Sequence, residues 1–445
     1  MRRWQLCLIV SSALFVGCGG AATPELQLIE DAAEAMGSLR AVRETTSLVL
    51  EGDGRVYRLG QNERPQAELP YYEIENYSLQ LDYENMRWRL SQDRTSTYLT
   101  GNPLFGARQS YGLDGEVAYD QRGEQTVRAS DQIAASRWAE MYHNPIGIVL
   151  LAFNETSTVS NLRDEGGRQA VDIVAANGTA FTLSVDGGTG LPYSVTSSTA
   201  HPNLGDVSVE TVFDGYEETG GLGGFQARLT LPRAYTTTMD RNTVSEYLTT
   251  TNTNATLDNL AAPAELQGSS PMESVTVEVE EVAEGLWLLA GQSHHSAVVE
   301  FDDFLALIEA PQSEARTLAV IARAREFQPD KPLRYVVNTH HHFDHSAGIR
   351  AAVSERLTVI THRVNRAFFE DIVSRTHSIA PDALARSPQP LTIETVASDE
   401  PYERGGATWV GVHIGNTKIT VTDREFSEME LGRYQGYDHL ALNTD

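Results

Sequence analysis

Residues 334–345 have the sequence RYVVNTHHHFDH, in which a short β-branched and aromatic run precedes three histidines, a phenylalanine, an aspartate and a fourth histidine. The run is typical of a buried strand. Small residues follow the cluster at 346–348, and residues 349–353 are able to begin a helix. The cluster is therefore predicted to lie on a strand-to-helix loop at the carboxyl end of a strand, where α/β folds place their chemistry.

Four side chains of this loop are candidate metal ligands. His340, His342, Asp344 and His345 fit the pattern H-x-H-x-D-H. Imidazole nitrogen and carboxylate oxygen are usual protein ligands of zinc, at about 2.0–2.2 Å. The alternative is a polar surface loop that is merely rich in histidine. The strand before the cluster and the small residues after it favour a metal site.

The stretch from Thr339 to His345 resembles the first metal motif, T-H-x-H-x-D-H, of the metallo-β-lactamase superfamily. The resemblance implies one or two Zn²⁺ ions, with His340 and His342 holding the first and Asp344 and His345 the second. It also implies a hydrolase in which metal-bound hydroxide attacks an ester- or amide-type bond of a small-molecule substrate. Asp344 would be the catalytic residue that orients the hydroxide and moves its proton.

The resemblance covers residues 275–416, and we expect a metallo-β-lactamase-like domain at 274–417 that forms a partial αββα sandwich. Family members carry further metal ligands in later motifs: a third histidine, a bridging aspartate and a final histidine. The segment 412–417 resembles the approach to that third histidine, but Lys418 follows it. We therefore expect an incomplete domain with impaired activity and an aberrant tail at 418–445, and we hypothesise a truncation or reading-frame change near Thr417.

Five other histidines are weaker candidates. His413 and His439 could substitute as ligands, although a histidine in a strand more often has a structural role. His294 and His295 lie on a loop between predicted strands that approaches the metal in this fold, where they could contact substrate or simply be solvated. His362 follows a strand and is predicted to be structural or to support a ligand.

The whole chain sets wider bounds. At 445 residues it is long enough for two domains. The net charge of −27, from 34 basic and 61 acidic residues, argues against a nucleic-acid partner. With 41% hydrophobic residues and a mean hydropathy of −0.31, the chain can build cores but does not resemble a polytopic membrane protein.

Residues 1–18 are predicted to be a lipoprotein signal peptide. Arg2 and Arg3 precede an apolar stretch, residues 6–16, that is too short to span a bilayer. The segment ends in a sequence that resembles a bacterial lipobox, with Cys18 as the residue to be lipidated. By that resemblance we expect a periplasmic protein held by this lipid, with outer-membrane sorting indicated by Gly19.

Residues 25–248 show the period-two alternation of an antiparallel sheet with a few helices. The layout and the turn from Asp186 to Pro192 resemble the curved half-barrel of the LolA/LolB lipoprotein carriers. A Thr-, Asn-, Pro- and Gly-rich stretch at 249–273 is interpreted as the linker. The predicted fold class is thus α+β, and the alternative function is a catalytically inactive lipoprotein that binds an apolar ligand through its N-terminal β domain.

Overall fold

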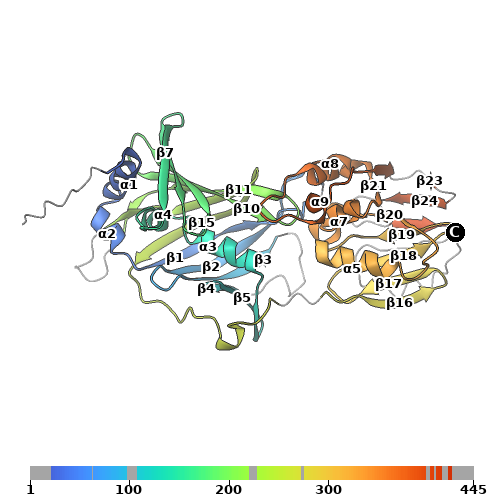
Figure 1. Cartoon of the computed structure of the whole chain (residues 1–445). Helices are drawn as coiled ribbons and strands as arrows, with labels where there is room; N and C mark the ends of the chain where they lie inside the picture. The colour runs from blue at the N-terminus through green and yellow to red at the C-terminus, as the bar shows by residue number, and fades with distance from the viewer. Residues whose placement is uncertain are drawn as a thin grey trace, which may run out of the picture.

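The computed structural model describes residues 22–62, 64–97, 108–219, 228–271 and 275–396, together with the backbone of three strands between residues 401 and 422. Two domains follow one another along the chain (Figure 1). The first is built on a 13-stranded antiparallel sheet and the second on a seven-stranded mixed sheet, so the predicted α+β class is confirmed. The expected signal peptide and Cys18 lie outside the described residues. Within the described ranges, no helix is both long and apolar enough to cross a bilayer.

The N-terminal sheet has the order β6-β5-β4-β3-β2-β1-β15-β14-β11-β10-β9-β8-β7, and its outer strands β6 and β7 do not pair with each other, so the sheet is open. The predicted alternation is confirmed in β2, where Tyr77, Leu79 and Leu81 are buried on one face. A tight turn follows, with the Asp82 carboxylate accepting hydrogen bonds from the backbone N–H groups of Glu84 and Asn85. The strands are β1 (Ser47–Tyr57), β2 (Tyr71–Asp82), β3 (Arg87–Ser96), β4 (Arg108–Asp114), β5 (Val117–Arg122), β6 (Gln125–Arg128), β7 (Thr158–Asp164), β8 (Arg168–Val174), β9 (Ala180–Asp186), β10 (Pro192–His201), β11 (Gly205–Asp214), β14 (Ala234–Met239) and β15 (Asn242–Thr253), with a separate small pair β12 (Glu217–Glu218) and β13 (Thr230–Leu231).

In the described part of the N-terminal domain, four α-helices accompany this sheet: α1 (Pro24–Ala35), α2 (Leu39–Arg43), α3 (Asp131–Glu140) and α4 (Pro145–Ala152). Each begins at a side chain that caps it, Thr23, Ser38, Ser130 or Asn144, because the first backbone N–H groups of a helix lack partners within it. Their apolar faces share one core with the inward side chains of the strands, including Trp88, Phe181 and Leu183.

The start of the predicted linker is wrong. Residues 249–253 form the end of β15, and this strand pairs with β1 in the middle of the sheet, for example Thr251 with Leu50. Threonine is favoured in strands, so the polar run continues the sheet instead of leaving it. The connection after Asn254 also packs on the domain, where Leu266 joins an apolar cluster with Val117 and Tyr119.

The C-terminal sheet has the order β16-β17-β18-β19-β20-β21-β22. Its first strands are antiparallel, and β19 to β22 are parallel. The elements are β16 (Glu278–Ala283), β17 (Leu286–Ala290), β18 (Ser296–Glu300), β19 (Leu305–Ile308), β20 (Leu333–Val337), β21 (Thr358–His362) and β22 (Ile393–Val396), with α5 (Glu314–Ala324), α6 (Phe343–Ser346), α7 (Ile349–Ser354), α8 (Arg366–Ser374) and α9 (Ala383–Arg386).

Alternate residues of the parallel strands face two different layers. Val336 and Val359 pack against the helices α5, α7 and α8, while Val337 and Ile360 belong to a second core on the other face. A three-stranded sheet of β23 (Pro401–Arg404), β24 (Ala407–Val412) and β25 (Ile419–Thr422) places β24 in contact with β21. Most of the predicted tail, including residues 423–445, lies outside the described residues, but Ile419–Thr422 pairs with β24.

Candidate metal centre

The predicted metal motif lies at the carboxyl ends of the parallel strands. β20 ends at Val337, residues 338–342 form a loop, and α6 begins at Phe343. Glu309 follows β19 on one side of this loop and His362 ends β21 on the other. The placement predicted from the sequence is confirmed. The side chains that follow three adjacent strands meet at the carboxyl ends of those strands.

Asp344 and His345 converge with His294 from the loop before β18. The His294 Nε2 lies 3.1 Å from one Asp344 oxygen, and the His345 Nε2 lies 3.9 Å from the same oxygen. A ligand atom of each of these three residues falls within 4.8 Å of the other two, which is the spacing needed to share one ion. The His294 imidazole therefore faces the aspartate, and its side chain is 30% exposed.

His340 and His342 lie beside this group. The ring centroid of His340 lies 4.5 Å from that of His342 and 4.3 Å from that of His345. The Thr339 hydroxyl contacts the His340 Nδ1 at 2.7 Å. The His342 Nε2 lies 2.9 Å from the backbone carbonyl oxygen of Asn62, and a carbonyl oxygen only accepts, so Nε2 carries the proton and Nδ1 keeps its lone pair. All four predicted ligands are thus neighbours, but the ligand atoms that lie within 4.8 Å of one another are those of His294, Asp344 and His345, and His340 and His342 are not in that group.

The buried Glu309 contacts both Thr339 and His345 of the motif. The residue is 4% exposed. One carboxylate oxygen accepts the Thr339 backbone N–H at 2.8 Å, and the other lies 3.4 Å from the His345 Nδ1. This arrangement leaves the His345 Nε2 facing Asp344. The Glu309 backbone has φ = 68°, a conformation that costs energy for a residue with a Cβ and is found where a functional site requires it.

The charges within the cluster keep the aspartate ionised. Burial by itself raises the pKa of Asp344, but hydrogen bonds from His294 and Gln61 and the nearby His345 hold that pKa well below its ordinary value. Burial lowers the pKa of His345, yet the carboxylates of Glu309 and Asp344 outweigh it and raise that pKa. Burial also lowers the pKa of His342. Ionised carboxylate and neutral imidazole are the forms that bind zinc.

Three residues near the motif were not anticipated. His341, the residue between the predicted ligands, is buried, its Nε2 lies 3.1 Å from the Asn62 side-chain oxygen, and burial lowers its pKa to about 4. The Gln61 amide donates to Asp344 at 2.7 Å. Gln61 and Asn62 belong to the N-terminal domain, and nothing in their local sequence marks them, because the contact spans 283 residues.

The remaining histidines have other places. His362 is buried and its Nδ1 accepts from the backbone N–H of Val364, capping a short 3₁₀ helix, as a structural role predicts. His295 neighbours His294 but is not part of the converging group. His413 and His439 lie outside the described residues.

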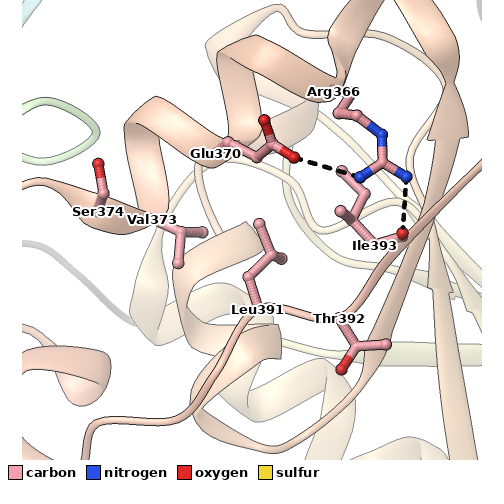
Figure 2. Close-up of a pocket in the computed structure, with 7 residues that line it drawn as sticks. All are labelled: Arg366, Glu370, Val373, Ser374, Leu391, Thr392 and Ile393. Atoms are coloured by element: carbon pink, nitrogen blue, oxygen red, sulfur yellow. Dashed lines mark hydrogen bonds and ion pairs between the residues drawn. The ribbon is translucent and has the colours of Figure 1, made fainter.

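A cavity of about 470 Å³ lies elsewhere on the C-terminal domain. Figure 2 shows its lining, in which Arg366 bonds to Glu370 and to the backbone oxygen of Ile393. It opens on the side of α8 opposite Phe368, whose ring contacts His341. None of the predicted metal ligands lines this cavity.

Residues 290–412 match the family model of the metallo-beta-lactamase superfamily. The matched segment contains the whole motif and His294, so the resemblance predicted from residues 339–345 is confirmed there. No curated protein matches the chain.

Among solved structures, the chain is similar to a metallo-beta-lactamase from Pontibacter korlensis, with 17% identity over 31% of this chain and 60% of that one, and a TM-score of 0.23. A metallo-beta-lactamase from Hirschia baltica has 19% identity over 33% of this chain and 70% of that one, with a TM-score of 0.23. A LolA superfamily protein from Nitrosomonas europaea has 9% identity over 54% of this chain and 96% of that one, with a TM-score of 0.30. The chain therefore spans about 60% of the length of the first of these proteins.

Proposed function

We propose that this protein is a zinc-dependent hydrolase of the metallo-β-lactamase superfamily, acting on an ester- or amide-type bond of a small molecule and anchored to a bacterial membrane through a lipid on Cys18. The observation that supports the activity most directly is the convergence of His294, Asp344 and His345, with ligand atoms within 4.8 Å of one another. His340 and His342 add two imidazoles at the edge of this group.

The residues present fit a zinc ion. Imidazole nitrogen and carboxylate oxygen match its preference, and histidine ligands of metals usually donate their second ring N–H to a carbonyl or carboxylate. His342 does so toward the Asn62 carbonyl, and the His345 Nδ1 faces Glu309. A bound zinc ion lowers the pKa of water to about 7 and so supplies a nucleophile at neutral pH.

The chain's own groups then have separate tasks. Asp344 stays ionised, so it can accept a hydrogen bond from the attacking water and hold that water in one orientation. Its other oxygen is fixed by the Gln61 amide. The His345 side chain is held by Glu309 from behind, which limits the rotation of its ring.

Adjacent histidines on one loop provide a matched test. Zinc content of the purified full chain is measured by elemental analysis for the wild type, His294→Ala and His295→Ala, alongside hydrolysis of a chromogenic ester. We expect wild type and His295→Ala to retain zinc and hydrolyse the ester, and His294→Ala to lose most of both. Equal zinc in the two variants would contradict the site. A zinc-free wild type that releases lipid on organic extraction would instead support the alternative of an apolar-ligand carrier.

A further inference from the structure

A turn of the N-terminal domain touches the metal motif at several atoms. This turn, Gly60–Asn62, follows β1. The Asn62 carbonyl accepts from the His342 Nε2 at 2.9 Å, and the Gln61 amide donates to Asp344 at 2.7 Å. The Gly60 carbonyl accepts the backbone N–H of Phe343 at 3.3 Å. Two of these contacts end on side chains predicted to bind metal.

The contacts to His342 and Asp344 determine which atom of each side chain is free to bind an ion. The Asn62 carbonyl requires a proton on the His342 Nε2, which leaves Nδ1 as that residue's only lone-pair nitrogen. Gln61 holds one oxygen of Asp344, while the other faces His294. Such partners behind metal ligands set tautomer and orientation.

We propose that the Gly60–Asn62 turn completes the metal centre from the other domain, with Gln61 and Asn62 as positioning residues for Asp344 and His342. The inference rests on the proposed function, since it assigns these residues a role toward the ion bound there. It makes the active centre a product of both domains, although all five candidate ligands belong to one.

The domain interface holds the turn in place. Asp206, in β11, accepts from the backbone N–H groups of Ser378 and Ile379 at 2.8 and 3.0 Å. Arg375 pairs with Asp240 at 3.1 Å. In Figure 1 the ends of β10 and β11 meet the C-terminal domain beside α8 and α9. An apolar cluster spans the same junction, made of Leu204, Val207 and Ile372 with Leu59, Met239, Phe343 and Phe368 packed against them.

Gly60 permits the close approach of the turn. Its φ is 72°, and a Cβ placed there would lie 2.3 Å from the Phe343 ring, closer than real Cβ contacts allow. A larger residue at this position must therefore displace the turn or the Phe343 ring at the start of α6. Gly115, in the β4–β5 turn, has a similar φ of 60°, but a Cβ there would meet nothing within 4 Å. The two glycines share the backbone strain of substitution and differ in the contact.

The experiment compares zinc affinity of full-length wild type, Gly60→Val and Gly115→Val by competition with a chromogenic chelator. We expect Gly60→Val to bind zinc about 10- to 100-fold more weakly, the usual effect of losing groups behind the ligands, and Gly115→Val to match wild type. Cobalt absorption spectra should change in Gly60→Val only, because the ligand geometry changes. Wild type without zinc affinity contradicts the proposed function itself. Zinc-binding wild type with an equal or tighter Gly60→Val overturns the inference alone.

A second pair of variants covers the case in which Gly60→Val does not fold. Gln61→Ala removes the amide that bonds Asp344, and Gln66→Ala removes an exposed amide from the same connection. We expect Gln61→Ala to weaken zinc binding by about tenfold and to alter the cobalt spectrum, with Gln66→Ala unchanged. Identical affinities and spectra in both variants would overturn the positioning role.

Discussion

Replacing the buried Glu309 by glutamine isolates the support that the cluster receives from one carboxylate. The amide oxygen of Glu309→Gln can still accept the Thr339 N–H, now made at 2.8 Å. The amide NH₂ then faces the His345 Nδ1, 3.4 Å from the present carboxylate oxygen. Since two donors cannot face each other, the ring must move its proton to Nε2, the nitrogen that faces Asp344. His345 then has no lone pair to offer to the ion.

The expected loss follows from that change of tautomer. Removing a partner behind a metal ligand costs about 10- to 100-fold in affinity, or about 1.4–2.7 kcal/mol at 1.36 kcal/mol for each factor of ten. The assay is chelator competition for zinc at pH 7, with thermal unfolding recorded for each protein. Glu300→Gln is the matched control, because Glu300 is also a mostly buried carboxylate, pairs with Lys331, and lies at the opposite end of the β18–β19 pair. An unchanged zinc affinity in Glu309→Gln, with the fold intact, would refute the reasoning.

Two further predictions concern stability and its dependence on pH. Asp382 accepts two hydrogen bonds from the buried Arg350, so Asp382→Asn should lower the free energy of unfolding in urea by about 3 kcal/mol. Burial raises the pKa of Asp382, but Arg350 brings it below the usual value, so this contribution is present above about pH 4 and is lost as the pH falls further. If the free energy of unfolding of the variant fell below pH 4 as steeply as that of the wild type, the prediction would be wrong. His143 is hydrogen-bonded to Ser197 and Thr211, and burial lowers its pKa to about 4. Because His143 takes up a proton below about pH 6.5 in the unfolded chain but not in the folded one, the free energy of unfolding should fall by about 2 kcal/mol between pH 7 and 5. His143→Gln should remove that part of the pH dependence, and the same fall in the variant and the wild type would disprove it.

The local patterns of the sequence predicted most of the elements that carry the fold. Period-two alternation in residues 25–248 predicted the antiparallel sheet of the N-terminal domain, and the β-branched run before the motif corresponds to β20. The error at residues 249–253 has a physical reason. A polar threonine and asparagine run suits both a linker and a strand, and only its pairing with β1, some 200 residues away, decides between them.

The candidate site was predictable only where its residues lie close together in the sequence. His340, His342, Asp344 and His345 share one loop, so spacing alone suggested that they converge. His294 comes from a different strand connection, and its role depends on how β18 pairs with β19 and on where the β20 loop then falls. The φ of 68° at Glu309 gives no signal in the sequence either, because glutamate rarely adopts it.

The contacts between the domains connect folding with the metal centre. Asp206 and Arg375 fix the orientation of the two domains away from the motif, and Gln61 reaches Asp344 from the same junction. An ion that binds only the native site stabilises every part of the protein that must unfold to release it. At a free-ion concentration of 100 times the dissociation constant, the free energy of unfolding rises by about 2.7 kcal/mol. Because Gln61 and Asn62, in the turn after β1, contact two of the candidate ligands, that stabilisation should extend to the N-terminal domain, although none of the candidate ligands belongs to it. Loosening this junction should therefore weaken binding of the proposed ion even when every candidate ligand is intact.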